Sequence, residues 1–318
     1  MYKIRHAGAK GLGVFATQRI ACGTRIKAEK PLITVGGESQ VYAAARSLSP
    51  SDMQVLRSLS SNVASKLSIL DWVNAAWHIG RDVVSSKPGS SPATESYLGR
   101  LRDAPRLLDV FRTNNFDIGN ATQAVFGEIA RFNHACSPNA QGNFNSLLGC
   151  FTIHAVRAIE VGEELTLSYL AQNTSRTAQR QEKLLKHYGF SCDCPACDES
   201  LPANKLTEQK RLHFHDKQAA FHEAAEGRDT PDQQGELEVV MALIDHAEAS
   251  SLLGRELATM YITAAEMAAR LGLTLEVVRY AERGLELDAA VLGEDNPMFA
   301  ESVARARAVG VELSSRAV

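Results

Sequence analysis

Three cysteines lie close together in the run Cys192-Asp-Cys194-Pro-Ala-Cys197, and a fourth, Cys136, lies upstream in RFNHACSPNA. A closed tetrahedral zinc site takes four protein ligands, and a Cys-x-Cys-x-x-Cys run supplies three thiolates. Cys136 is the obvious fourth ligand. The spacing therefore predicts one structural zinc ion held by all four cysteines. Such an ion would also fix the loop that carries Cys136.

Disulfide pairing is the alternative for these cysteines. The stretch MYKIRHAGAKGLGVFA lacks the apolar core of a signal peptide, so we expect a reducing compartment, the cytoplasm or the nucleus or both. Clustered cysteines in such a compartment bind metals or act in catalysis more often than they form disulfides.

Composition limits the kinds of protein this can be. At 318 residues and 45% apolar content, the chain can bury a large core and divide into two or more domains, which makes a monomer reasonable. No window approaches eighteen uninterrupted apolar residues, so we expect no membrane span. A net charge of −3 offers no basic footprint for nucleic acid, and direct nucleic-acid binding is not expected.

The elements that must position the cysteines follow from hydrophobic periodicity. Short strands and tight glycine turns are expected first. A helical stretch follows, which opens on a Ser-Pro cap signal in SLSPSDMQVLRSL, and period two returns in GCFTIHAVRAI and EELTLSYL. The predicted parts are 1–39 and 113–175 as the two halves of a β core, 40–112 as a helical insertion with a surface loop at 85–96, 176–200 as the zinc segment, and 201–318 as a helical domain.

Charged residues near the zinc segment admit simple interpretations. Arg176, Arg180 and Lys183 recur at helical spacing, which favours a solvated helix face, with a substrate-facing one as the alternative. Glu163 and Glu164 follow a turn signal and are interpreted as solvated turn residues without chemistry.

Four motifs in a fixed order resemble those of SET-domain lysine methyltransferases. They are GAKGLGVF at 8–15, NHACSPN at 133–139, GEELTLSY at 162–169 and FSCDCPAC at 190–197. A split core with a helical insertion and a helical C-terminal part looks most like the SET and MYND domain group. The MYND zinc module is missing from this resemblance, because residues 36–112 contain no cysteine.

The resemblance implies a fold of the α+β class. We expect a SET-type core of short strands, a helical insertion, a post-SET zinc segment and an all-α C-terminal domain. The helical runs after residue 201 resemble a tetratricopeptide-like array, although no strict 34-residue repeat is visible.

The resemblance also implies a site for S-adenosylmethionine. The expected cofactor-binding residues are Lys10, Gly11, Leu12, Gly13, Asn114, Asn133, His134, Tyr188 and Phe190. Asn115 competes with Asn114 for its position, and a turn or helix cap is the alternative for either. Tyr188 and Phe190 would stack on the adenine and close the pocket.

Tyr169 is the expected catalytic residue, since the family places a tyrosine hydroxyl at the transfer site after this strand. The implied activity is methyl transfer to the amine of a lysine exposed on a protein substrate. Two alternatives stay open: transfer to a small-molecule or other amine, and an inactive SET-fold scaffold that binds a partner.

Overall fold

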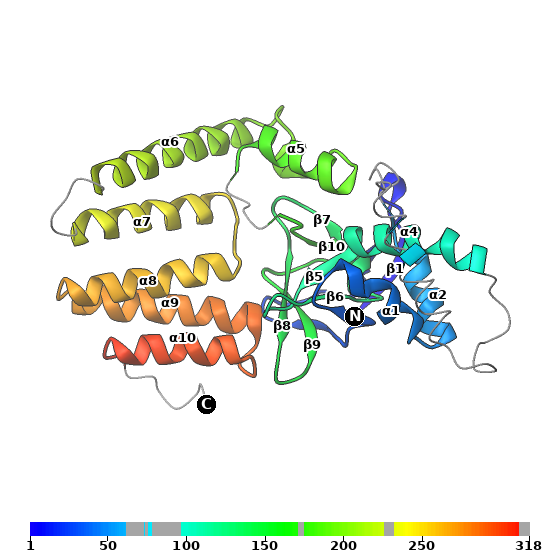
Figure 1. The fold of residues 1–318 in the computed structure, drawn as a ribbon. Helices are drawn as coiled ribbons and strands as arrows, with labels where there is room; N and C mark the ends of the chain where they lie inside the picture. The colour runs from blue at the N-terminus through cyan, green and yellow to red at the C-terminus, as the bar shows by residue number, and fades with distance from the viewer. Residues whose placement is uncertain (62–72, 74–75, 78–96, 171–174, 226–231, 312–318) are drawn as a thin grey trace. The chain divides into compact units, whose positions relative to one another are not determined.

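The structure is a computed structural model that describes residues 1–61, 73, 76–77, 97–170, 175–225 and 232–311 (Figure 1). The predicted loop at 85–96 lies outside the described residues, as do residues 62–72, 74–75 and 78–84 of the predicted helical insertion before it. The chain divides into two compact units. Unit 1 comprises Met1–Ala28, Phe132–Lys183 and Ser191–Val318, and unit 2 comprises Glu29–Arg131 and Leu184–Phe190.

A four-stranded sheet of unit 1 brings together segments that are far apart in the sequence. Its strands, in order, are β1 (Tyr2–His6), β2 (Leu12–Ala16), β10 (Glu164–Leu167) and β7 (Asn133–His134). β10 runs antiparallel to β2 with Glu164 opposite Phe15, and parallel to β7 with Leu167 opposite His134. β10 therefore connects the glycine turn at the start of β2 with the strand that precedes Cys136.

A second sheet of unit 1 has the order β3 (Arg25–Glu29), β9 (Cys150–Ala155) and β8 (Ala140–Asn145). The strand predicted in GCFTIHAVRAI is β9. Its burial does not alternate, since only Cys150 is partly exposed. A strand covered on both faces is buried continuously, and here helix α9 packs against β8 and β9.

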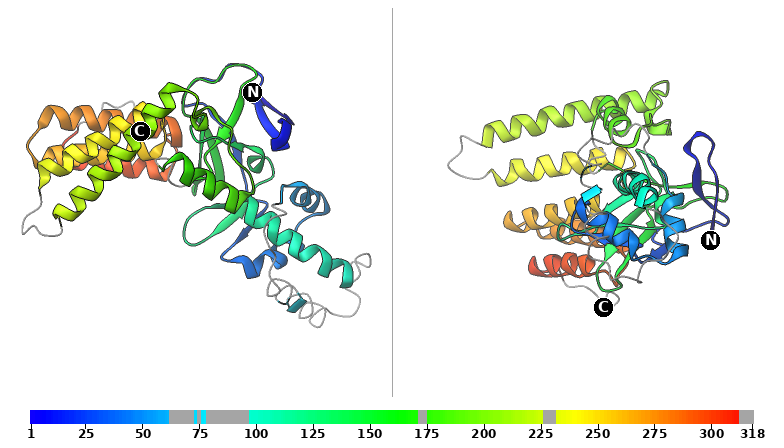
Figure 2. Two further views of the ribbon diagram at one scale, coloured as in Figure 1. Left: turned by 90° about the horizontal axis from the view of Figure 1, so that it is seen from above. Right: turned by 45° about the vertical axis from the view of Figure 1, so that its right-hand side comes forward.

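In the part of the chain that the structure describes, five helices make up the C-terminal part of unit 1 and lie side by side in chain order (Figures 1 and 2). They are α6 (Pro202–Ala225), α7 (Gln233–Ala249), α8 (Arg255–Arg270), α9 (Thr274–Leu292) and α10 (Pro297–Ala308). Local sequence starts two of them: the side chains of Asp232 and Asn296 accept hydrogen bonds from Gly235 N and Met298 N, which caps α7 and α10.

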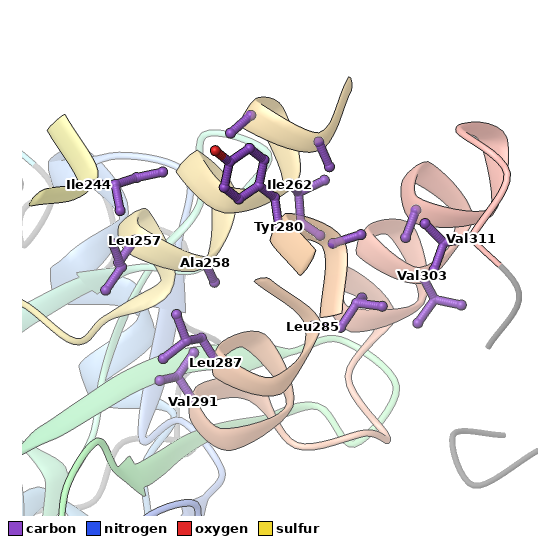
Figure 3. Close-up of a cluster of buried hydrophobic side chains, with 14 of the residues drawn as sticks. Ile244, Leu257, Ala258, Ile262, Tyr280, Leu285, Leu287, Val291, Val303 and Val311 are labelled. Atoms are coloured by element: carbon purple, nitrogen blue, oxygen red, sulfur yellow. The ribbon is translucent and has the colours of Figure 1, made fainter. Parts of the chain in front are cut away.

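The core between these helices is built from aliphatic residues such as Leu257, Ile262 and Val291 (Figure 3). Helices α8 and α9 approach each other closely at Gly284. A Cβ at that position would lie 2.8 Å from Ile262 Cδ1 and 3.1 Å from the Ala258 carbonyl oxygen. The glycine is therefore required by packing, since its φ is not positive.

Polar contacts join the C-terminal helices to the β8–β9 hairpin. Asn143 Nδ2 donates to the Val291 carbonyl at 3.2 Å, and Arg255 N donates to Gln141 Oε1 at 2.8 Å. Val156, just after β9, belongs to the same apolar core as the helices. The helices are thus an integral part of unit 1.

Unit 2 contains a small antiparallel sheet with the order β4 (Ile33–Val35), β6 (Gln123–Val125) and β5 (Asn115–Asp117). Its helices are η2 (Glu38–Gln40), α1 (Val41–Arg46), α2 (Pro50–Ser58), α4 (Tyr97–Asn114) and η3 (Ile129–Arg131). Ser49 caps α2 by accepting from Asp52 N, with Pro50 at the first helical position, as the Ser-Pro signal predicts. The Glu29 carboxylate accepts backbone hydrogen bonds from Gly127, Glu128 and Ile129.

The mixed strands and helices with a helical C-terminal region confirm the α+β class. The exact domain boundaries and the tetratricopeptide-like identity of the C-terminal helices stay predictions. No described helix combines the length and apolar character that crossing a bilayer requires.

His154 on β9 makes the stability of unit 1 depend on pH. The ring is 1% exposed, and its Nε2 accepts a hydrogen bond from Arg25 Nε at 3.1 Å. Burial, followed by the charge of Arg25, lowers the pKa of His154 from 6.5 to about 4. Between these two values the unfolded chain binds a proton that the folded chain does not. Lowering the pH through this range therefore destabilises the fold, by up to about 3 kcal/mol from this residue.

We expect His154→Gln to show a shallower loss of unfolding free energy from pH 6.5 to 4 than the wild type, because glutamine cannot take up this proton. Urea unfolding at several pH values measures the slope. His6→Gln, which changes an exposed histidine, serves as the control and should keep the wild-type slope. Equal slopes for wild type and His154→Gln would contradict the assignment.

Candidate functional site: a thiol cluster beside a glycine turn

The four cysteines predicted as metal ligands converge in unit 1. The sulfur atoms of Cys136, Cys192, Cys194 and Cys197 all lie within 4.8 Å of one another. Cys136 Sγ lies 3.5 Å from Cys197 Sγ and 4.0 Å from Cys192 Sγ. The first three cysteines are buried and Cys197 is half-buried. None of the four takes part in a disulfide.

Local structure explains how these thiols meet. Cys136 follows β7, and its backbone N–H donates to Cys194 Sγ at 3.4 Å. Cys194 begins the short helix η4 (Pro195–Cys197), and Cys197 N donates to its carbonyl at 2.8 Å. Helix α5 (Thr177–Tyr188) holds the segment from the other side: Gln181 donates to the Cys192 carbonyl at 2.7 Å and accepts from Cys192 N at 2.8 Å.

The cluster has the dimensions of a closed four-thiolate metal site. Tetrahedral ligands at about 2.3 Å from zinc lie about 3.8 Å from each other, and the separations of 3.5 and 4.0 Å from the Cys136 sulfur fall on either side of that value. Hydrogen bonds from Cys136 and then Cys192 lower the pKa of the Cys197 thiol to about 7. The same neighbours lower the pKa of Cys194. Contacts with the other thiols and burial raise the pKa of Cys136 and Cys192. Two of the four thiols thus favour the thiolate form, and a bound metal ion would be needed to hold all four as thiolates.

His134 connects the cluster with Tyr169. Its buried ring places Nε2 3.3 Å from Cys136 Sγ, and its Nδ1 accepts a hydrogen bond from Tyr169 N at 3.0 Å. Burial lowers the pKa of His134 to about 4, so the ring is neutral near pH 7. Because Nδ1 is an acceptor, the single ring proton sits on Nε2 and points to the Cys136 sulfur.

Tyr169 lies just past the end of β10, beside His134, with their ring centroids 5.3 Å apart. The parallel pairing of Leu167 with His134 sets this position. The half-buried hydroxyl of Tyr169 donates to the Phe132 carbonyl at 2.7 Å. A phenolic hydroxyl can act as both donor and acceptor.

The Lys10–Gly13 turn adjoins Asn133 in the same sheet. Helix η1 (Gly8–Lys10) leads into Gly11, whose φ of 78° lies in the left-handed region that favours glycine. Asn133 Nδ2 donates to the Leu12 carbonyl at 3.1 Å and to Glu164 Oε1 at 2.7 Å. A Cβ on Gly13 would lie 2.6 Å from Glu164 Oε1 and 2.8 Å from Asn133 Nδ2.

The sequence interpretation missed Glu164. The residue is a member of the site and not a solvated turn residue: its carboxylate accepts from Asn133 and lies 3.5 Å from Lys10 Nζ. Lys10 Nζ also lies 3.4 Å from Asp193, and after the lowering effect of burial these two carboxylates raise the pKa of Lys10. The alternation of side chains along the strand in EELTLSYL could have indicated that Glu164 is not a turn residue, since a strand places it on the same face as the buried Thr166.

Asn114, Tyr188 and Phe190, three further predicted cofactor residues, belong to unit 2. Asn114 is buried at the end of α4, and its Nδ2 donates to the carbonyls of Val110 and Ser60, both at 2.7 Å. The competitor Asn115 donates to the Phe111 carbonyl at 3.0 Å. Both asparagines thus terminate the helix, as the capping alternative expects. The Tyr188 and Phe190 rings lie 6.5 Å apart, and burial raises the pKa of Tyr188.

Residues 11–170 match the family model of the SET domain. Because this span is half of the 318-residue chain, the chain belongs to the SET domain family. The resemblance inferred from the four motifs is therefore confirmed at the family level.

Named relatives agree with this membership. Histone-lysine N-methyltransferase set5 of Schizosaccharomyces pombe is 29% identical over 223 residues, which are 69% of this chain and 58% of that protein. Human histone-lysine N-methyltransferase SMYD3 is 34% identical over 127 residues, 35% of this chain and 29% of that protein. The chain thus matches little more than half of one relative and under a third of the other.

One solved structure similar to this chain is the SET domain of LSMT bound to lysine and AdoHcy. It aligns with a TM-score of 0.35 at 14% identity, covering 96% of this chain and 87% of that one. This likeness is too low to support structural inference.

Gly13→Ala tests the glycine turn. We expect the added methyl group to displace Asn133 and Glu164 and to lower the free energy of unfolding by about 1–2 kcal/mol, because their hydrogen bond is lost. Glu164→Ala should then cost less in the Gly13→Ala background than in the wild type, as measured by a double-mutant cycle in urea. Gly37→Ala is the control, since Gly37 has an extended φ of 176° and an added Cβ would meet nothing within 4 Å. Additive effects of Gly13→Ala and Glu164→Ala would rule out the predicted clash.

Proposed function

We propose that this chain is an S-adenosylmethionine-dependent protein-lysine N-methyltransferase with one structural zinc ion. Membership of the SET domain family supports the proposal, and so do the relatives named as histone-lysine N-methyltransferases. The observation that carries it is the grouping of the glycine turn, Asn133, His134 and Tyr169 around β10 in one compact unit.

The residues of unit 1 suit a cofactor with an amino-acid end. The turn leaves open space around Gly11, where a Cβ would meet nothing within 4 Å, so backbone groups can approach a ligand. Lys10 offers a cation for a carboxylate, and Glu164 offers an anion for an ammonium group. When bound, S-adenosylmethionine supplies an electron-poor methyl group for transfer. Contacts from Asn114, Tyr188 and Phe190 stay predictions of the family resemblance.

Tyr169 would orient the acceptor amine. Its hydroxyl donates to the Phe132 carbonyl, and a phenolic oxygen has lone pairs that can accept from the amine of a substrate lysine. His134 holds the backbone of Tyr169, so the position of the hydroxyl is fixed before substrate arrives. Lysine has a pKa near 10.4, and the amine must lose its proton before it can attack the methyl group.

The substrate would be a protein with an exposed lysine, in the cytoplasm or the nucleus. Because the relatives are longer than the matched region, their own substrates do not define those of this chain. The monomeric state, the lack of nucleic-acid binding and the tetratricopeptide-like array remain expectations from the sequence.

Tyr169→Phe separates cofactor binding from chemistry. We expect isothermal titration to show one S-adenosylmethionine site with a Kd within about threefold of the wild type, because the hydroxyl faces the acceptor. Transfer of labelled methyl to protein in a cell extract should fall by about 100-fold or more, as when one transition-state contact is removed.

Several outcomes would refute parts of this account. No cofactor binding by the zinc-loaded wild type would refute any methyltransferase and favour the scaffold. Label entering only small molecules would refute the protein substrate. An unchanged rate in Tyr169→Phe would refute the catalytic assignment alone.

Cys194→Ser tests the metal. We expect the wild type to contain one zinc ion per chain by atomic emission, and Cys194→Ser to contain close to none. The melting temperature should fall by several degrees, since metal binding contributes to folding. Cys22→Ser changes an exposed cysteine outside the cluster and should keep both values. A wild-type chain without metal after expression in zinc-supplied medium would contradict the prediction.

A further inference from the structure

Arg180 is buried, although its spacing with Arg176 and Lys183 predicts a solvated helix face. Arg176 and Lys183 are exposed as predicted, but Arg180 is 0% exposed and is the largest fully buried side chain among the described residues. The prediction of a solvated or substrate-facing side chain is therefore wrong for Arg180. The reason is that helix α5 turns this residue towards the cysteine segment, which the helical periodicity alone does not show.

The hydrogen bonds of Arg180 involve only its two terminal nitrogens: among the described residues Nε has no partner, and the bonded groups carry no counter-charge. The guanidinium donates to the carbonyls of Ser175 and Ala196, the latter at 3.4 Å, and to Thr177 Oγ1 at 3.1 Å. No carboxylate of the residues that the structure describes forms an ion pair with it. A buried cation without a counter-charge is strongly destabilising, so a negative charge is needed nearby.

In the part of the chain that the structure describes, the thiol cluster is the one group in contact with Arg180 that can be anionic. Arg180 Nη2 lies 3.9 Å from Cys197 Sγ. Four thiolates around one divalent cation carry a net charge of about −2. A tetrathiolate metal site therefore supplies the charge that the arginine lacks.

We propose that Arg180 is the counter-charge of the metal site: it offsets part of the negative charge of the four thiolates and so strengthens metal binding. This inference rests on the proposed zinc ion. The stabilisation is mutual: the negative thiolates lower the free-energy cost of burying the guanidinium, and the guanidinium lowers the repulsion among the four clustered thiolates. Arg180 acts through the sulfur ligands and is a positioning residue that takes no part in methyl transfer.

The experiment compares Arg180→Met, Arg180→Gln and Lys183→Met in the full chain under reducing conditions. Zinc affinity is measured by competition with a chromogenic chelator, and the cobalt-substituted proteins are examined for their sulfur-to-cobalt charge-transfer band. Lys183→Met removes the same charge one turn further along α5, from an exposed side chain. Arg180→Gln keeps hydrogen-bond donors and removes only the charge and length.

We expect both Arg180 variants to bind zinc about 10–100-fold more weakly than the wild type. Their charge-transfer band should move to lower energy, since loss of a nearby cation makes the sulfur electrons easier to remove. Lys183→Met should match the wild type in both readouts. A purely structural Arg180 would lower the melting temperature without moving the band.

Wild-type zinc affinity and an unshifted band in Arg180→Gln would overturn the proposal. This variant decides the matter even where Arg180→Met does not fold. A wild-type chain that binds neither zinc nor cobalt would refute the zinc site itself. This outcome differs from one in which the metal binds normally and substitution of Arg180 has no effect, which would refute only the role of Arg180.

Discussion

The convergence of four sulfur atoms is the constraint on which the rest of unit 1 depends. Cys136 follows the strand that carries Asn133 and His134, whereas its three partners lie 56 or more residues later. A metal ion at this point would link the two loops, which are far apart in the sequence, through four coordination bonds. An unfolded chain rarely contains a preformed metal site. The free energy of metal binding would therefore contribute directly to the stability of the folded arrangement of these loops.

Two sets of hydrogen bonds connect the cysteine cluster to the rest of unit 1. On one side, His134 bridges from the Cys136 sulfur to the backbone of Tyr169, and its neutral ring allows one nitrogen to donate and the other to accept. On the other side, Gln181 and Arg180 tie helix α5 to the cysteine segment. The glycine turn joins the same unit through Asn133 and Glu164. The proposed cofactor site and the proposed metal site would thus be neighbours with separate roles, because a closed tetrathiolate leaves no open coordination position for a reaction.

Sequence reasoning could predict what local pattern encodes. The Cys-x-Cys-x-x-Cys run, the motif order and the Ser-Pro helix start are local signals, and the family membership, the cysteine cluster and the cap of α2 agree with them. Arg180 and Glu164 were misjudged because their environment is set by partners distant in the chain. The pairing of β10 with β2 brings Glu164 to the glycine turn, and the return of the chain after α5 covers Arg180 with the cysteine segment. Charged residues at a turn or at helical spacing are usually exposed to solvent, and only tertiary contacts show which of them are buried.

The central claim is that the metal holds the cofactor site together, and the affinity for S-adenosylmethionine with and without zinc tests it most directly. Isothermal titration on one preparation, before chelation, after zinc removal and after zinc is restored, gives this comparison. We predict that affinity falls by at least about tenfold on removal and returns with zinc, and that S-adenosylmethionine strengthens zinc binding by the same factor. Unchanged cofactor affinity in the metal-free, folded chain would contradict the account.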